Sequence, residues 1–563
     1  MSAAEHLEQA RTHLSAGESD QAMAAIRLAL AEEPENLDAM LFAARLVRQG
    51  GNPQAAESLY SKIIEHHPES AAALAGLGAC FGMSRRYERA VVLLRQAVTL
   101  KPDYFEAWSF LGEALIEQGR TEEAMDCFER SLTILPHNGA ALSKQLFYSV
   151  FDPRYDAKRV ATLNRDWGTL VGGKIQRLPP PFVKAADGRI RIGYLSDEFY
   201  ERVTTRFLTP VFAHHDRTRF HVTGYARNAR QDETTETLRG HTDAWRDIAG
   251  LDDAEAAARI RADDIDILVI CTSYRVEART VLAYKPAPIQ LCYSNLVSTT
   301  GLEAVDYLVT EESTDPVGCD DLYTEALVRI SNRNIYMPPH GAPDPGPLPC
   351  LENGAVRFAS FNNLGKLSPA AIGAWSRILK ALPASKLTLK SVNRLQDSGA
   401  RDYFSGLFGS HGIDQEQLEF LSGDADLRAH LERYRAVDIA LDPFPCNGGT
   451  TSCEALWMGV PVVTMAGDTF MGRQGVNYLG KLGLEDLIAK NAESYVAAAV
   501  QLATDTPRLQ QLRVDLRDTV TERLFDPQRH VIELETAYAE MWRRHGAGEE
   551  PGPFRVAGNR VLA

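Results

Sequence analysis

A proline recurs every 34 residues in the first quarter of the chain, at Pro34, Pro68, Pro102 and Pro136. Other positions share this period. Small residues stand twelve and twenty-four positions before each proline: Ala10, Ala22, Ala44, Ala56, Gly78, Ala90, Gly112, Ala124. Small residues at a fixed period allow neighbouring helices to touch closely, so the pattern predicts a stack of helix–turn–helix units.

A period of 34 residues is typical of tetratricopeptide repeats. Bulky residues precede three of the prolines by eight positions, at Tyr60, Leu94 and Phe128. We therefore predict an α-solenoid of four units over residues 1–147, whose concave face holds a protein segment. The alternative is that these helices only dimerise or cap the rest of the chain.

Beyond the repeats, the pattern changes to alternating strands and helices. We expect linker helices and a proline-rich connector over 148–187, an N-terminal α/β lobe over 188–345 and a C-terminal α/β lobe over 346–525. A final helix is expected at 526–545, and the glycine- and proline-rich residues 546–563 are expected to be disordered. The strands predicted for the two lobes are 190–195, 221–225, 266–272, 289–293, 307–310, 358–361, 387–390, 418–421, 438–441 and 462–465.

The run from Leu441 to Thr464 combines a strand end, a glycine turn and a helix start. Gly448 and Gly449 allow a sharp turn, and Thr450 and Thr451 stand where a helix begins. Free backbone N–H groups and the helix dipole make such a start an anion site, at the strand end where α/β proteins bind ligands. The alternative is an ordinary strand–turn–helix connection.

A second polar loop follows another predicted strand of the same lobe. It carries Asn362, Asn363 and Lys366. The ammonium of Lys366 is suited to a phosphate. Alone it could be a solvated surface charge, and the two asparagines could be turn formers.

Charge and cysteine content exclude several functions. The formal net charge of −15 disfavours nucleic-acid binding, since phosphates repel such a surface. The eight cysteines form no CxxC pair and no cluster with histidine, so we expect neither a metal site nor disulfides. No apolar run is long enough for a membrane span and the first residues resemble no signal segment, so we expect a cytoplasmic protein without membrane contact.

Several motifs closely resemble those of glycosyltransferase family 41, the O-linked N-acetylglucosamine transferases, called SPINDLY-like in bacteria. They are Phe361-Asn362-Asn363 with Lys366-Leu367-Ser368-Pro369, the run from Leu441 to Pro461, and Thr299-Thr300-Gly301 before Asp306-Tyr307. The resemblance extends from the repeats to about residue 545. It implies a two-lobed GT-B region that transfers a sugar from a nucleotide donor to serine or threonine of a protein, without a metal or other cofactor.

The resemblance also implies roles for individual residues. Lys366 and the helix start at Thr450 and Thr451, with Gly448 and Gly449 in its turn, would hold the donor phosphate. The remaining donor contacts that it implies are Asn363 and His430 near the nucleotide, Glu454 near the ribose, Arg473 on the following helix, and Thr299, Thr300 and Gly301 beside the sugar.

The N-terminal lobe departs from the family pattern. Family members usually carry Asp-Phe-x-x-His after the first strand, whereas this chain has Glu198-Phe199-Tyr200-Glu201-Arg202. Arginine cannot act as a base at neutral pH, but it binds carboxylates and phosphates. Arg202, Arg206 and Arg275 therefore suggest an acidic donor sugar such as a nonulosonic acid, and Glu198 and Glu201 are the candidate general bases.

We therefore expect a protein O-glycosyltransferase whose repeats hold the acceptor. Similar bacterial transferases modify flagellin, which makes flagellin a candidate acceptor. The alternatives are a transferase that uses UDP-N-acetylglucosamine, and a scaffold or nucleotide-sugar sensor without catalysis.

Overall fold

The computed structural model describes residues 1–179, 188–271, 276–293, 298–333, 335–338, 341–392, 394–424 and 426–562. Arg275 and the segment 294–297 lie outside the described residues, as do most residues of the expected proline-rich connector. The chain divides into two compact units. The first contains residues 1–145 and 392–406, and the second contains 146–391 and 407–563.

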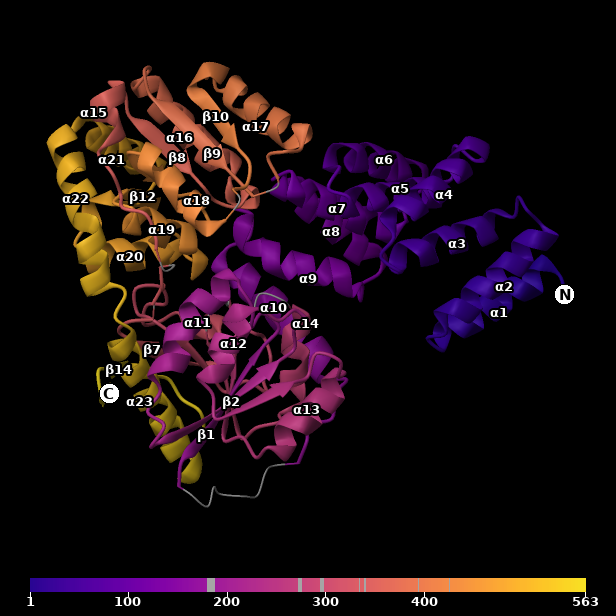
Figure 1. Ribbon diagram of the computed structural model, residues 1–563, viewed down its shortest axis with the longest axis horizontal. Coiled ribbons are helices and arrows are strands. Elements are labelled where there is room, and N and C mark those ends of the chain that lie inside the picture. Colours follow the sequence, from indigo (N-terminus) through magenta and orange to yellow (C-terminus); the bar gives the residue numbers. More distant parts are fainter. Residues whose placement is uncertain are drawn as a thin grey trace. The chain divides into compact units, whose positions relative to one another are not determined.

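The first unit contains the predicted solenoid of paired antiparallel helices (Figure 1). Each repeat proline lies two residues beyond the end of the second helix of a pair. The helices are α1 (Ala3–Ser15), α2 (Ser19–Glu32), α3 (Leu37–Gln49), α4 (Pro53–His66), α5 (Ala71–Met83), α6 (Tyr87–Leu100), α7 (Phe105–Glu117) and α8 (Thr121–Ile134), followed at the boundary of the unit by α9 (Gly139–Tyr148).

The small residues of the repeat occupy the helix contacts, as the period predicts. A Cβ atom on Gly78 would lie 2.6 Å from the side chain of Leu94, and one on Gly112 would lie 2.5 Å from Phe128. These distances are far below van der Waals contact, so a larger residue would separate the paired helices.

The same unit contains a short segment that comes from far along the chain. Both Nε and Nη2 of Arg394 bond to the carboxylate of Glu117, at 2.9 and 3.0 Å. Asp397 accepts from the backbone N–H of Glu88 at 3.1 Å, near the start of α6, where no residue of that helix supplies a side-chain cap. Segment 392–406, from a distant part of the same chain, thus supplies a helix cap that the repeat sequence lacks.

The N-terminal lobe of the second unit is built on a nine-stranded sheet of order β15-β14-β7-β6-β5-β4-β1-β2-β3. All neighbours are parallel except β14 and β15. Its strands are β1 (Ile190–Ser196), β2 (Phe220–Ala226), β3 (Ala244–Asp247), β4 (Ile267–Ile270), β5 (Ile289–Cys292), β6 (Tyr307–Thr310), β7 (Ala326–Ile330), β14 (Phe554–Ala557) and β15 (Arg560–Leu562). The helices of this part are α10 (Ala157–Gly172), α11 (Val203–His214), α12 (Glu233–Gly240), α13 (Asp253–Ala262) and α14 (Val276–Arg279).

The C-terminal lobe is built on a parallel sheet of order β10-β9-β8-β11-β12-β13. Its strands are β8 (Arg357–Ser360), β9 (Lys386–Lys390), β10 (Leu418–Leu421), β11 (Ile439–Leu441), β12 (Val462–Met465) and β13 (Ile488–Ala489). Its helices are α15 (Pro349–Asn353), α16 (Pro369–Ala381), α18 (Leu427–Arg433), α19 (Thr450–Trp457), α20 (Gln474–Leu482), α21 (Ala492–Thr504) and α22 (Thr506–Arg523). Helix α17 (Ser398–Ser410) begins among the residues of the first unit and ends among those of the second. Repeats followed by two parallel α/β lobes confirm the predicted fold class.

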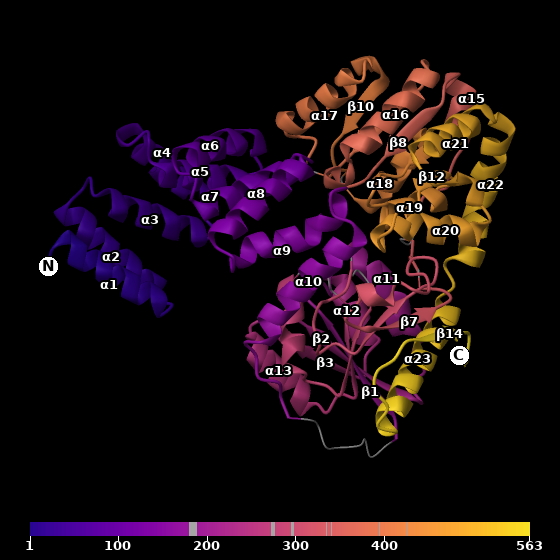
Figure 2. The same cartoon turned by 180° about the vertical axis from the view of Figure 1, so that it is seen from behind.

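The end of the chain returns to the N-terminal lobe. Helix α23 (Pro527–Gly546) lies against β5, β7 and the final hairpin, and Figures 1 and 2 show it beside this sheet from both sides. The expectation of a disordered tail is therefore wrong. Phe554 and Val556 are buried in the core of the lobe, and burial of these apolar side chains orders a segment whose composition suggested disorder.

Replacing Phe554 with alanine is expected to destabilise the N-terminal lobe by about 3–5 kcal/mol, because it leaves a cavity at a buried position of β14, beside the edge strand β15. Urea unfolding followed by circular dichroism measures the change. Val561→Ala, at a side chain that is 40% exposed on the adjacent strand, is the control and is expected to change stability far less. Equal stability of Phe554→Ala and the wild type would show that the hairpin is dispensable.

Candidate functional site

The glycine turn and the helix start that follow β11 are positioned by one buried carboxylate. Oδ1 of Asp442 accepts the backbone N–H of Gly448 at 2.6 Å and the hydroxyl of Ser452 at 3.2 Å. Its Oδ2 accepts the hydroxyl of Thr464, in β12, at 2.8 Å. A Cβ on Gly448 would lie 2.7 Å from Asp442 Oδ1, so only glycine allows this close approach.

Helix α19 begins at Thr450, as predicted, and its start is suited to an anion. Gly449 is the N-cap and supplies no side-chain hydrogen bond. Thr450 and Thr451 are both partly exposed, so side chains do not seal the helix start. Backbone N–H groups at an uncapped helix start attract negative charge, and the helix dipole adds to this attraction.

The second polar loop lies beside the same turn. Nζ of Lys366 donates to the main-chain carbonyl of Asn447 at 2.6 Å, directly before the two glycines. Thr451 Oγ1 donates to Oδ1 of Asn362 at 2.9 Å, which ties the loop after β8 to α19. Asn363 caps a short turn through Gly365 and holds the loop in shape. The structure thus brings Lys366 and the turn together, as the sequence suggested.

Asp442 was not identified from the sequence, although a carboxylate directly after a strand and before a glycine turn was a usable signal. Burial raises its pKa to about 6, while the Gly448 N–H group, Thr464 and the nearby charge of Lys366 act against this rise. Because the folded pKa exceeds the ordinary value of 3.8, the fold favours the protonated form. Its stabilising contribution is complete below pH 3.8 and is lost as the pH rises through about 6.

Asp442→Asn is expected to remove this pH dependence, because the amide does not titrate. The free energy of unfolding of the wild type, relative to that of the variant, should fall by about 2 kcal/mol between pH 4.5 and pH 7.5. Urea titrations of both proteins at several pH values provide the measurement. A difference that stays constant across this range would mean that Asp442 keeps an ordinary pKa.

Glu454, in α19, is the centre of a buried polar network. Its Oε2 lies 2.9 Å from Nε2 of His430, and its Oε1 accepts from Arg206 and Tyr336, each at 3.3 Å. Arg206 comes from α11, so this carboxylate joins the two lobes of the second unit. The family role near the ribose remains a prediction, and in this structure protein groups bond to both carboxylate oxygens.

His430 continues this network to a lysine that the sequence did not single out. Its Nδ1 contacts Nζ of Lys390, at the end of β9, and Lys390 forms a buried ion pair with Asp424. Desolvation lowers the pKa of Lys390, and Asp424 opposes this change. The pair neutralises a charge that burial alone would make costly.

Thr299 and Thr300 are fully buried and bond to Glu325. Thr299 Oγ1 donates to Oε2 at 2.7 Å, and the Thr300 N–H group donates to Oε1 at 2.8 Å. Gly301 has a φ of +76°, and a Cβ there would lie 1.9 Å from the carbonyl oxygen of Asn164 in α10. These contacts hold the loop of Thr299, Thr300 and Gly301 against α10. Its role beside the donor sugar stays a prediction.

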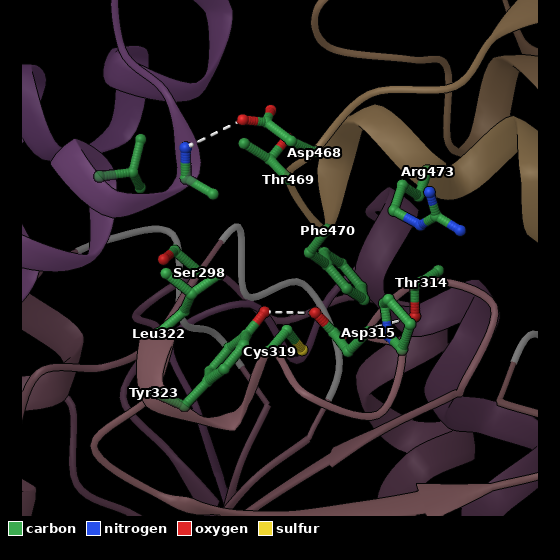
Figure 3. A pocket seen from close by; sticks show the side chains of 13 residues that line it. Ser298, Thr314, Asp315, Cys319, Leu322, Tyr323, Asp468, Thr469, Phe470 and Arg473 are labelled. Atoms are coloured by element: carbon green, nitrogen blue, oxygen red, sulfur yellow. Dashed lines mark hydrogen bonds between the residues drawn. The ribbon is translucent and has the colours of Figure 1, made fainter. Parts of the chain in front are cut away.

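A cavity of about 120 Å³ lies between loops of both lobes (Figure 3). Tyr323 donates to Asp315 at 2.5 Å, and Figure 3 shows the two side chains pointing toward each other. Arg473 and Phe470 line the cavity from the other lobe, and Nε of Arg473 donates to the carbonyl of Ser313 at 3.0 Å. Arg473 thus lies at the lobe interface, and the N–H group of Asn447, the partner of Lys366, donates to the carbonyl of Met471 in the same short turn at 3.0 Å.

The two candidate bases have different surroundings. Glu198 is buried, accepts from Thr204 Oγ1 at 2.7 Å and lies 3.7 Å from Nε of Arg202. Glu201 is exposed, and its carboxylate accepts from Arg206 at 3.1 Å and from Thr234 at 3.0 Å. Both carboxylates are therefore engaged by protein groups, and their catalytic role stays a prediction.

In the described part of the chain, no three His, Cys, Asp or Glu side chains are grouped so that they could hold a metal ion. None of the helices within the described ranges combines the length and the apolar character needed to cross a bilayer.

Comparisons with known proteins identify the family of this chain. The model of glycosyl transferase family 41 matches residues 157–340 and 349–534, and a tetratricopeptide-repeat model matches 13–80 and 83–144. The probable UDP-N-acetylglucosamine–peptide N-acetylglucosaminyltransferases SPINDLY of Solanum lycopersicum and Arabidopsis thaliana are 34% and 35% identical over 70% of this chain. The chain spans 43% and 44% of the length of these plant relatives.

A solved structure extends the similarity to nearly the whole chain. A mutant of the Thermobaculum terrenum O-GlcNAc transferase aligns with a TM-score of 0.80 and 33% identity, covering 91% of this chain and 98% of that protein. The family model matches well over half of the chain. This chain therefore belongs to glycosyltransferase family 41.

Proposed function

We propose that this protein transfers a sugar from a nucleotide donor to a serine or threonine hydroxyl of a protein. The observation that carries this proposal is the uncapped start of α19 with Lys366 beside it, in a chain of family 41. The repeats would bind a part of the acceptor that is distant from its reacting hydroxyl, and this contact would add binding energy. A scaffold without catalysis has no specific contact in its favour.

The chemistry follows from where negative charge develops. When the bond between the anomeric carbon and the phosphate breaks, charge accumulates on the departing phosphate. The Lys366 ammonium and the N–H groups at the start of α19 are fixed donors that would stabilise this charge. Glu198 or Glu201 would accept the proton of the attacking hydroxyl, once substrate binding releases one of them from its present partners.

The donor sugar has two candidates. The names of the plant relatives favour N-acetylglucosamine carried on UDP. Arg202, at the position of the family histidine, favours an acidic sugar, because a guanidinium pairs with a carboxylate. For the acceptor we retain flagellin, which only the family resemblance suggests.

Intact-mass measurement of candidate acceptors, flagellin among them, tests the transfer. Acceptors purified from cells with and without the gene should differ by the mass of one or more sugars, and the mass increment identifies the sugar. Identical masses for every candidate, together with no transfer from nucleotide sugars by the purified protein, would contradict the proposal and favour a scaffold.

A further inference from the structure

A pocket in the N-terminal lobe lies at the carboxyl ends of β1, β2 and β3, apart from the site around Lys366. Its volume is about 420 Å³, within the range of small-molecule sites. Asp197 follows β1, Arg227 follows β2, and Ala249 lies just beyond β3. Ligands of open parallel sheets bind at this edge, so the position favours a binding site over an accidental surface hollow.

Two guanidinium groups face one aromatic ring at this pocket. The guanidinium carbons of Arg230 and Arg202 lie 5.0 and 5.4 Å from the centre of the Tyr200 ring, and Nε of Arg202 donates to the Tyr200 hydroxyl at 3.1 Å. Stacking on an aromatic ring holds a guanidinium in place while leaving its N–H groups directed outward. The Tyr200 ring therefore pre-orients positive charge at the pocket.

The charges of the pocket wall favour an anion. Arg227 and Arg230 line it, whereas Asp197 is the one carboxylate among its lining residues in the described chain. Arg227 is fixed by Asp253 at 2.8 Å. Arg230 lies 3.4 Å from Asp232, but that carboxylate also accepts the N–H groups of Thr235 and Glu201. Arg230 is thus the arginine of the pocket with the weakest carboxylate pairing.

The pocket is linked to the donor site through short contacts. Tyr200, in its wall, precedes Glu201, whose carboxylate accepts from Arg206 at 3.1 Å. Arg206 in turn donates to Glu454, in the same helix whose start forms the anion site. These contacts therefore connect the wall of the pocket to helix α19.

We propose that this pocket binds a carboxylate of the substrate, with Arg230 as the main contact and Arg227 as a fixed second one. The proposal rests on the proposed transferase function. A carboxylate reaches the enzyme from two sources, an acidic transferred sugar or an acidic side chain near the acceptor hydroxyl. A planar guanidinium can bond to both oxygens of either group.

Binding to the full-length protein tests the proposal in two arms. The sugar arm compares CMP-N-acetylneuraminic acid with UDP-N-acetylglucosamine. The acceptor arm compares two serine peptides that differ only by Glu or Gln next to the acceptor. Arg230→Gln is the main variant because its side chain is 64% exposed and its loss should not disturb folding. Arg259→Gln, at an exposed arginine of α13 outside the pocket, is the matched control.

Arg230→Gln is expected to raise Kd at least fivefold for the carboxylate-bearing probe of one arm, while the Kd of the probe without the carboxylate, and the Kd values of the control variant, stay within twofold. The responding arm identifies the source. Changes in Kd below twofold for both carboxylate-bearing probes overturn the pocket, as does failure of both to bind the wild type. If Lys366→Ala still weakens nucleotide-sugar binding in that case, the proposed function stands. If Lys366→Ala has no effect either, the proposed function fails as well.

Discussion

Lys366→Ala is expected to lower the rate of sugar transfer about 100- to 1,000-fold, because one fixed donor to a developing negative charge contributes about this much. Nζ of Lys366 lies 2.6 Å from the Asn447 carbonyl, directly before the glycine turn. The ammonium is thus held where a phosphate at the start of α19 would lie. The repeats are a separate compact unit, so acceptor binding should be unchanged.

Single-turnover transfer followed by intact mass measures the rate, and pull-down of the acceptor measures binding. Lys386→Ala is the matched control, because Lys386 is an exposed lysine at the start of β9 in the same lobe. Lys366→Arg keeps the positive charge but carries it on a planar guanidinium group, so this variant should recover part of the rate. Wild-type turnover by Lys366→Ala would remove this residue from the phosphate site.

Gly448→Ala is expected to weaken nucleotide-sugar binding at least tenfold and to destabilise the C-terminal lobe by about 1–3 kcal/mol or more. The added Cβ would lie 2.2 Å from Ser452 Oγ and 2.7 Å from Asp442 Oδ1. Both atoms belong to the hydrogen bonds that hold the start of α19. The turn must therefore open, and the backbone N–H groups at the start of α19 would no longer point toward the donor phosphate.

The neighbouring glycine provides an internal comparison for stability. A Cβ on Gly449 would meet no described atom within 4 Å. Thermal unfolding should therefore show a much smaller decrease in Tm for Gly449→Ala than for Gly448→Ala. Equal decreases in Tm would mean that backbone freedom, and not contact with Asp442, explains the need for glycine here.

The sequence predicted those features that depend on local pattern. The 34-residue period fixed the solenoid, because each pair of helices needs small residues where it touches, and Gly112 against Phe128 is one such contact. The α19 start was readable because two glycines and two threonines lie together in the chain. Ser368 followed by Pro369 is a further local signal of a helix start, and the Ser368 hydroxyl accepts from the Ala371 N–H group at the start of α16.

What depends on distant residues was missed. Strand β3 has four residues and no β-branched side chain, so its sequence does not separate it from a loop until β2 pairs with it. Strand β7 was missed although its Leu-Val-Arg-Ile run was a usable signal. Strand β14 depends on a distant partner, because its Val556 pairs with Ile330 more than two hundred positions earlier. Local composition at 546–563 indicated disorder, but the sheet edge and the core beneath it supplied partners that order the segment.

The sequence by itself determined the repeats, the two α/β lobes, and the lysine loop and the glycine turn as two separate polar segments, since each of these follows from period and residue type within a short window. Only the tertiary structure decided which side chains are engaged. In the folded chain, Asp442 accepts a hydrogen bond from Gly448, and Glu325 accepts hydrogen bonds from Thr299 and Thr300. Glu454 accepts one from Arg206. Hydrogen bonds between residues far apart in the chain, and the burial of their side chains, leave no pattern in the local sequence. They can therefore be identified only in the folded structure.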